Sequence, residues 1–225
     1  MYVKNNSFDE GTVFSNISQD AYNKLKEKEI LLVGLADYII NTCHLLIDAG
    51  IRKLHLMDWD ANINEQEEDK KLDKLRTSLK EANPDIDLKT YKSERPGEKL
   101  TNLLTEVDLI IDCTNHFPYS ILIDQMAKKS GIPWIYGASA GAVCIYKFVN
   151  SHQGESISGW LSGSGIPASF GTCSNGLLTT INGIIASLQS TSAIKYLTEA
   201  EGKIDQQLYY IDIWNNKFDK ININN

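Results

Sequence analysis

Two features between residues 30 and 58 point to nucleotide chemistry. The apolar run Ile30–Val33 has the composition of a buried parallel strand, and Gly34 follows at the point where the chain would turn into a helix. A second apolar run, Lys53–Met57, ends at Asp58. An acidic residue after the second strand is where a nucleotide-binding strand–helix–strand unit holds a ribose hydroxyl. We therefore expect Gly34 and Asp58 to belong to one site.

The turn after the first strand lacks most of the glycines that a phosphate-binding loop requires. A G-x-G-x-x-G loop would lie at Gly34–Ile39, which reads Gly-Leu-Ala-Asp-Tyr-Ile. The glycines of such a loop let backbone amides approach phosphate oxygens closely. Ala36 and Ile39 stand at the second and third glycine positions, and Asp37 adds a carboxylate where phosphate would lie. Gly34 is explained more simply by a tight turn than by phosphate contact.

The composition is that of a soluble globular protein with one domain. The chain has 225 residues, of which 42% are hydrophobic and 23% charged. Its net charge of −7 argues against nucleic-acid binding, because neutralising phosphates needs a basic surface. No apolar run approaches the length of a membrane span, and the first six residues lack an apolar signal core. We expect a cytoplasmic protein without nucleic-acid or membrane partners.

The four cysteines do not form a metal-binding pattern. Cys43, Cys113 and Cys144 lie in apolar segments and are predicted to be small core residues. Cys173 follows a Gly/Ser-rich stretch and is the one candidate for a reactive thiol, although no basic neighbour is visible to lower its pKa. No pair is spaced as C-x-x-C, so we expect no zinc and no other metal site.

Apolar runs alternate with amphipathic segments along the chain, which is typical of an α/β protein. The pattern predicts a Rossmann-like, mostly parallel sheet with helices on both faces. Predicted strands cover Ile30–Val33, Lys53–Met57, Ile86–Tyr91, Val107–Cys113, Pro133–Gly137, Ala142–Val149 and Leu208–Ile213. Predicted helices cover Ala21–Lys28, the segment after Gly34 as far as Ala49, Glu65–Ala82, Glu98–Leu104, Ser120–Lys129 and Ser174–Glu199.

The same pattern sets the domain limits. We expect a loosely structured arm over residues 1–20, a single α/β domain over 21–215 and a frayed tail over 216–225. The Gly/Ser-rich stretch Asn150–Gly171 is predicted to be a long crossover loop before the C-terminal helix. A loop of that length within a compact domain is usually functional or mobile.

The order of these elements resembles the ThiF/MoeB/HesA family, the bacterial relatives of ubiquitin-activating enzymes. The resemblance covers residues 22 to about 213 and rests on stretches that are each common but occur here in the family's order. The stretches are Tyr22–Lys26, Asp48–Ile51, Leu56–Asp60, Val107–Asn115 with Ile135–Ala138, and Thr172–Gly176 with Ile184–Gln189 and Ala193–Lys195. The resemblance implies a ThiF/MoeB-type fold, commonly dimeric, that adenylates the C-terminal carboxylate of a ubiquitin-like sulfur carrier or a peptide with ATP and Mg²⁺.

The resemblance assigns roles to individual residues. Asp58 matches the ribose-binding acid, and Lys71 matches the phosphate-contacting lysine. Gly34 and Ala36 match the glycine loop. Asn115 stands where the family has a metal-binding aspartate, and its amide offers an oxygen but no charge, so Mg²⁺ would be held weakly. No catalytic residue is assigned.

The family's arginines are absent. The chain has only Arg52, Arg76 and Arg95, none at a family arginine position, and Ser120 aligns with the arginine that follows the D-C-T-D motif. The C-x-x-C pairs of many members are absent too, which again predicts no zinc.

Three functions remain open on this basis. The first is a non-catalytic partner or scaffold that binds a ubiquitin-like carrier, a peptide or an active family member, as a homo- or heterodimer. The second is a working adenylyltransferase whose arginines come from a partner. The third is an unrelated small-molecule-binding Rossmann protein. The losses in the glycine loop, the metal position and the arginines favour the first and argue against bound ATP and Mg²⁺.

Overall fold

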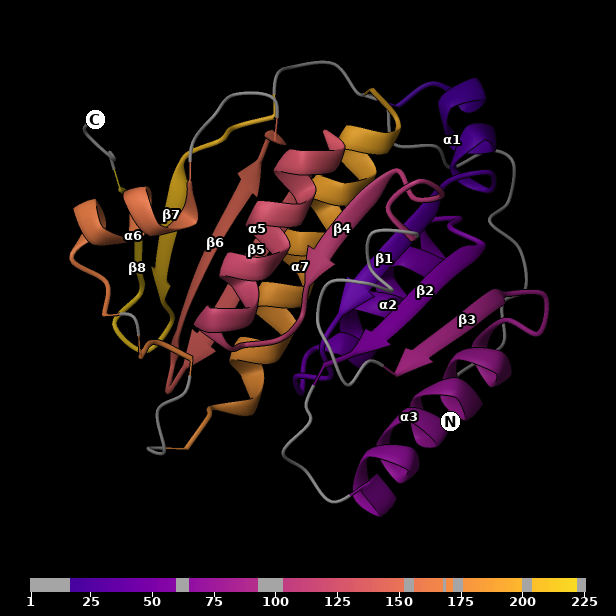
Figure 1. Cartoon of the computed structure of the whole chain (residues 1–225), viewed down its shortest axis with the longest axis horizontal. Coiled ribbons are helices and arrows are strands. Elements are labelled where there is room, and N and C mark those ends of the chain that lie inside the picture. Colours follow the sequence, from indigo (N-terminus) through magenta and orange to yellow (C-terminus); the bar gives the residue numbers. More distant parts are fainter. Residues whose placement is uncertain are drawn as a thin grey trace.

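The computed structural model describes residues 17–59, 65–92, 103–151, 156–167, 169–171, 176–199 and 204–221, and these residues form an α/β layer structure (Figure 1). Its strands are β1 (Glu29–Val33), β2 (Lys53–Asp58), β3 (Asp87–Lys92), β4 (Leu109–Asp112), β5 (Trp134–Ala140), β6 (Val143–Val149), β7 (Leu208–Asp212) and β8 (Lys217–Ile221). Its helices are α1 (Gln19–Leu25), α2 (Ile39–Asp48), α3 (Glu65–Ala82), α5 (Phe117–Ser130), α6 (Ile157–Ser164) and α7 (Thr179–Leu197).

The strands form a single eight-stranded sheet in the described part of the chain, in the order β3-β2-β1-β4-β5-β6-β7-β8. The first five neighbours in this order run parallel, and β6, β7 and β8 continue the sheet antiparallel. Strand order reverses between β1 and β4, whose pairing runs from Ile30 with Leu109 to Val33 with Asp112. The predicted α/β class, with a mostly parallel sheet, is confirmed.

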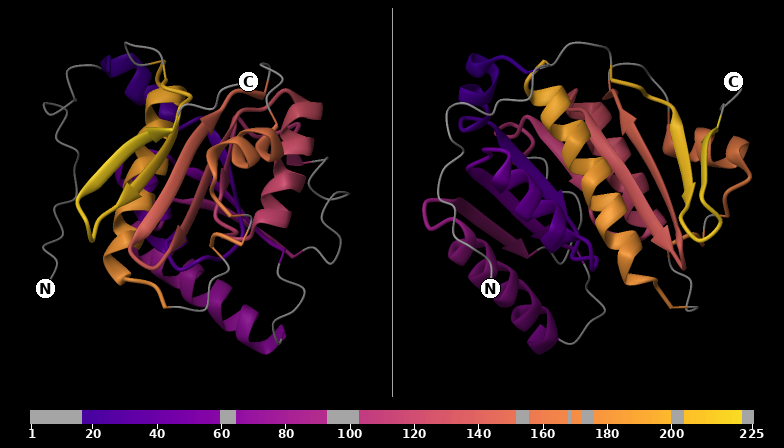
Figure 2. Two further views of the ribbon diagram at one scale, coloured as in Figure 1. Left: turned by 90° about the vertical axis from the view of Figure 1, so that its left-hand side faces the viewer. Right: turned by 180° about the vertical axis from the view of Figure 1, so that it is seen from behind.

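Helices cover both faces of the sheet, as the sequence predicted (Figure 2). On one face α2 and α7 lie side by side, and Tyr38, Cys43 and Ile185 are fully buried there with Leu32 of β1. Leu72, Leu75 and Leu79 of α3 join the same core, because their spacing places them on one face of the helix. On the other face α5 and α6 bury Ile123 and Trp160 against Leu31 and Trp134. Cys113 and Cys144 are buried, which confirms the prediction for these thiols.

Two segments differ from the sequence prediction. The crossover predicted as a loop over 150–171 contains helix α6, which starts at the N-cap Ser156 and buries Ile157 and Trp160. The segment 216–225, predicted as a frayed tail, contains β8, which pairs with β7 and closes the sheet on that side. Most of the predicted helix Glu98–Leu104 and the candidate thiol Cys173 lie outside the described residues.

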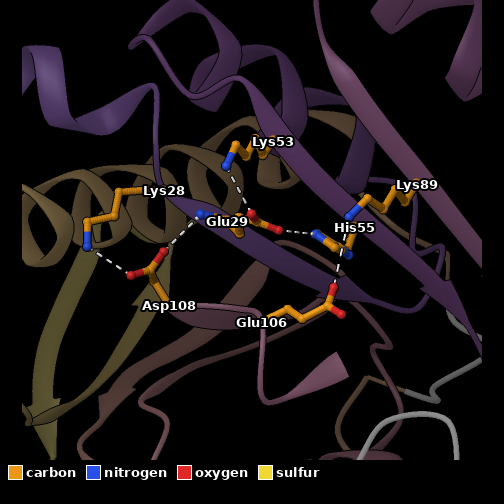
Figure 3. A network of polar contacts seen from close by, with 7 residues as sticks. All are labelled: Lys28, Glu29, Lys53, His55, Lys89, Glu106 and Asp108. Atoms are coloured by element: carbon orange, nitrogen blue, oxygen red, sulfur yellow. Dashed lines mark hydrogen bonds and ion pairs between the residues drawn. The ribbon is translucent and has the colours of Figure 1, made fainter. Parts of the chain in front are cut away.

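A network of charged side chains joins the amino-terminal ends of the parallel strands (Figure 3). Glu29 of β1 accepts hydrogen bonds from Lys53 Nζ at 3.0 Å and from His55 Nε2 at 2.8 Å. The other ring nitrogen of His55, which is 1% exposed, lies 3.2 Å from the Tyr91 hydroxyl. Burial opposes the charge of Glu29, but the hydrogen bonds from Lys53 and His55 hold the pKa of its carboxyl below the usual value.

The same network extends to the segment before β4. Asp108 accepts hydrogen bonds from the Glu29 amide at 2.9 Å and from Lys28 Nζ at 2.8 Å. Lys89 and Glu106 form a looser and more exposed pair at 3.9 Å. The network therefore ties β1, β2, β3 and the entrance to β4 together.

None of the helices in the described residues is both long enough and apolar enough to cross a membrane.

Candidate functional site

A cavity of about 330 Å³ opens at the carboxyl ends of β1, β2 and β4, at the opposite end of the strands from the charged network. This is the switch point of the sheet, where open α/β proteins bind their ligands. The five residues predicted to bind a cofactor all line it: Gly34, Ala36, Asp58, Lys71 and Asn115. The fold therefore brings these five positions together, as the resemblance implied. Each of the five residues makes its own set of contacts.

Gly34 is required by the backbone rather than by a ligand. Its φ is +93°, and a Cβ built there would lie 2.4 Å from the Cα of Thr114. Its amide donates to the Met57 carbonyl at 2.7 Å. The retained glycine thus lets the turn after β1 pass close to the end of β4, in agreement with its interpretation as a tight turn.

Ala36 and Asp37, two and three residues after Gly34, both disfavour a bound phosphate. The Ala36 amide donates to the Cys113 carbonyl at 2.9 Å, so this loop N–H already has an acceptor. Asp37 lies one residue before the N-cap of α2, where the helix dipole favours negative charge. The loop thus carries its own carboxylate at the position that favours a bound anion.

Lys71 is directed to this loop. Its Nζ donates to the Leu35 carbonyl at 3.0 Å and lies 3.6 Å from Asp37 Oδ1. Both side chains are exposed, by 53% for Lys71 and 66% for Asp37, so the ion pair is worth at most about 1 kcal/mol. The consequence is electrostatic: the ammonium group that would face a phosphate faces a carboxylate of the same chain.

The Asn115 side chain is engaged with the main chain on both sides. Its Nδ2 donates to the carbonyls of Ser139 at 3.1 Å and Gly171 at 3.0 Å, and its Oδ1 accepts from the Ser139 amide at 2.8 Å. Its φ of +50° is left-handed, a conformation that asparagine tolerates better than most residues. A Cβ at Gly171 would lie 2.8 Å from Asn115 Oδ1. Asn115 therefore ties the end of β4 to β5 and to Gly171.

Ser120, at the position of a family arginine, points into the protein. Its hydroxyl donates to Asp112 Oδ2 at 2.5 Å, and Asp112 is fully buried at the end of β4. Burial raises the pKa of Asp112 to about 6, against hydrogen bonds from Ser120 and Thr114 that lower it. This pair supports the end of β4 and supplies no cation to the cavity.

Sequence reasoning missed an aromatic side of the cavity. Trp59 and His116 both pack against Tyr119, with ring centroids 5.8 and 4.6 Å away. Trp59 Nε1, His116 Nδ1 and Ser139 Oγ have no hydrogen-bond partner in the described part of the chain. Trp59 and Ser139 are each only 1% exposed. Trp59 directly follows β2, and Ser139 lies near the carboxyl end of β5. These positions are the sequence feature from which their place at the cavity could have been predicted.

The charges of the described lining are unfavourable for a triphosphate with its metal. Its described lining carries two carboxylates, Asp37 and Asp58, and one ammonium group, Lys71, and it includes no arginine. No cluster of three or more His, Cys, Asp or Glu side chains among the described residues is arranged to hold a metal ion. Asp58, the last residue of β2 and 6% exposed, lies at the position where the sequence predicted a ribose-binding acid.

Strand order, a cavity at the switch point and an acid ending β2 define an α/β protein of the Rossmann-like type. The chain matches the ThiF family over residues 8–225. It belongs to the ThiF family.

Relatives of known name agree with this assignment. The sulfur carrier protein ThiS adenylyltransferase of Bacillus subtilis (strain 168) is 24% identical over 219 residues, 91% of this chain and 64% of that protein. The molybdopterin-synthase adenylyltransferase of Escherichia coli (strain K12) is 26% identical over 203 residues, 82% of this chain and 80% of that protein. The chain thus spans slightly less than two thirds of the Bacillus enzyme.

Solved structures show the same fold. The crystal structure of E. coli MccB with AMPCPP and MccA superposes with a TM-score of 0.73 at 14% sequence identity. The match covers 90% of this chain and 65% of MccB. At this identity the likeness establishes the fold alone.

Proposed function

We propose that this chain is a non-catalytic member of the ThiF family that binds a ubiquitin-like carrier, a peptide or an active family member. The observation that carries the proposal is the pairing of Lys71 with Asp37 inside the loop that would hold phosphate. Its named relatives are adenylyltransferases, so the proposed loss concerns the chemistry and not the fold.

The number of independent changes supports this proposal. Adenylation brings an anionic carboxylate against an anionic triphosphate, so charge has to be neutralised at the reacting atoms. Removing one preorganised charge-stabilising donor typically costs about 10²–10³-fold in rate. Here the arginines are absent from the described lining, Lys71 faces Asp37, and the Asn115 amide is bonded to the main chain. Such losses together would leave little adenylation.

The outermost hairpin supports a binding role. Trp214 lies between β7 and β8 and is 75% exposed, and Phe218 of β8 is 67% exposed. Large exposed aromatic side chains near each other commonly mark protein contacts. We propose this hairpin as the partner-binding surface, in a homo- or heterodimer or in a complex with a carrier. The proposal also includes a cytoplasmic location and no zinc.

A second candidate keeps the enzymatic activity. Asp58 and Lys71 both line the cavity, as a working adenylyltransferase would require. In that case a partner chain would supply the arginines, and Lys71 would have to leave Asp37 for the phosphates.

ATP–pyrophosphate exchange separates the two candidates. The chain would be assayed alone and with each partner that co-purifies with it, beside the Bacillus ThiS adenylyltransferase with ThiS as the positive control. The non-catalytic proposal expects no exchange above background in any combination. Exchange that appears with a partner and disappears in Asp58→Asn would establish the enzymatic alternative.

A further inference from the structure

We infer that the cavity binds an uncharged ribonucleoside, one without a 5′-phosphate, and that Asp37 sets this selectivity. The inference rests on the proposed function, because it assumes that the site has given up ATP chemistry. It goes further by assigning a ligand class to the cavity that remains.

The charges of the cavity exclude phosphate and leave neutral ligands. Asp37 and Asp58 outnumber Lys71 in the described lining, which gives a formal charge of −1 when His116 is neutral. Asp37 also lies at the start of α2 and 3.6 Å from Lys71 Nζ, so a phosphate beside Lys71 would also lie near a carboxylate. Like charges at such short range repel, whereas a neutral group at the same place is not affected.

The ribose end of the cavity is retained. Asp58 ends β2 and is 6% exposed, and the Gly34 amide bonds to the neighbouring Met57 carbonyl, so the acid has a fixed position. A carboxylate at this point of a switch-point crevice accepts hydrogen bonds from ribose hydroxyls. A ligand that offers two hydroxyl groups and no negative charge is what such an acid favours.

The remaining polar atoms of the lining are neutral. Trp59 Nε1 is a donor, and Ser139 Oγ can donate or accept; both belong to side chains that are 99% buried and lack a partner among the described residues. Buried polar atoms without a partner are costly, which is why they commonly mark a site for a ligand or a water molecule.

Shape and aromatic content agree with this ligand. The cavity of about 330 Å³ is near the lower end of the range for small-molecule sites, roughly 300–1,000 Å³. Tyr119 contacts both Trp59 and His116, so the lining includes a group of aromatic rings. Flat bases bind to aromatic surfaces by stacking with little dependence on base identity.

Calorimetric titration of the full chain tests the inference. Adenosine, guanosine, cytidine, uridine and ATP–Mg²⁺ are the probes. We expect at least one ribonucleoside to bind with a micromolar Kd, and ATP–Mg²⁺ to bind at least tenfold more weakly. The 2′-deoxy form of the best nucleoside should lose at least tenfold in affinity, because a hydrogen bond to a charged acceptor is removed. This comparison uses the unaltered protein, so it does not depend on a variant folding.

Variants then assign the selectivity to residues. Asp37→Asn should raise the affinity for ATP–Mg²⁺ relative to the nucleoside about tenfold, since one repelling carboxylate is removed. Asp58→Asn should weaken the nucleoside at least tenfold, and its thermal melting curve checks that the variant is folded. Asp48→Asn is the matched control, because Asp48 is exposed and ends α2, at the opposite end of that helix from Asp37. It should leave both affinities unchanged.

The outcomes separate this inference from the proposed function. Absence of binding by all four nucleosides at millimolar concentration overturns the inference, and the non-catalytic proposal stands if exchange is also absent. ATP–Mg²⁺ binding tighter than every nucleoside, without exchange, likewise overturns only the inference. ATP–Mg²⁺ binding together with exchange overturns both.

Discussion

The charged network at the amino-terminal ends of the parallel strands and the cavity at their carboxyl ends differ in how their polar side chains are satisfied. At the amino-terminal end, Glu29 receives two side-chain hydrogen bonds (Figure 3). Both ring nitrogens of His55 have partners, Glu29 and Tyr91. At the carboxyl end, Trp59 Nε1 and Ser139 Oγ lack partners among the described residues. The first arrangement is that of a structural network, and we propose that a ligand uses the second.

The comparison also distinguishes residues within the cavity itself. Gly34 and Asn115 line it, yet their geometry is explained by contacts with Thr114, Ser139 and Gly171. Asp37 and Lys71 line it and are largely exposed, so the fold depends little on them. Changes in the first pair should therefore alter stability, and changes in the second pair should alter binding.

Gly34→Ala should have the largest effect on stability. The new Cβ would need φ near +93° and would lie 2.4 Å from the Thr114 Cα, so backbone has to move. We expect a loss of about 3 kcal/mol or more in the free energy of unfolding, measured by urea denaturation. Gly141→Ala is the control, because its φ is +60° but nothing lies within 4 Å of the new Cβ. Its expected loss is about 1 kcal/mol, and equal losses would refute the role of close approach.

Glu29→Ala should have the second largest effect on stability, because Glu29 holds the charged network at the amino-terminal ends of the strands. It leaves the buried His55 and the Lys53 ammonium without their carboxylate, so we expect a loss of about 2 kcal/mol. Glu106→Ala, which removes an exposed partner 3.9 Å from Lys89, should change stability by less than about 0.5 kcal/mol. Similar losses in the two variants would contradict the structural role of the network.

Asp112 should give the protein a characteristic pH dependence. Its folded pKa is raised to about 6, so between about pH 4 and pH 6 the folded state binds more protons than the unfolded state. Its contribution to stability therefore falls as the pH rises through this window, by up to about 1.4 kcal/mol per pH unit. Asp112→Asn should reduce this slope in urea denaturation curves recorded at several pH values. An unchanged slope would show that Asp112 does not titrate there.

Asp37→Asn should have the smallest effect on folding. The Asp37–Lys71 pair is exposed and 3.6 Å long, so we expect a change below about 0.5 kcal/mol in the free energy of unfolding. A loss above about 1 kcal/mol would mean that Asp37 is part of the structural framework and would weaken its assignment to ligand selectivity.

The sequence predicted those helices and strands whose own residues carry the pattern of that structure. The strand near Ile30–Val33 is present because its continuous apolar run is typical of a buried strand. The helix Glu65–Ala82 is present because its leucines recur with the spacing of one helix face. Helix α6 was not predicted, because Gly159 and the serines of its sequence lower helix propensity, and burial of Trp160 outweighs it. Strand β8 was not predicted because its charged sequence is paired only through contact with β7.

The site was predicted as a group of residues but not as a set of contacts. Asp58 and Asn115 follow parallel strands whose carboxyl ends meet, so their convergence could be inferred. The bond from Asn115 to Gly171 and the pairing of Lys71 with Asp37 join distant segments, and no local pattern indicates them. These contacts are what change the interpretation of the cavity.

The most direct test of the central claim, that this cavity no longer handles phosphate, is calorimetric titration with ATP–Mg²⁺. The chain would be titrated alone and then in complex with any co-purifying partner. The account predicts that ATP–Mg²⁺ binds at least tenfold more weakly than the best nucleoside in either state. A micromolar Kd that weakens in Lys71→Ala would contradict it, because Lys71 would then serve the phosphates despite Asp37.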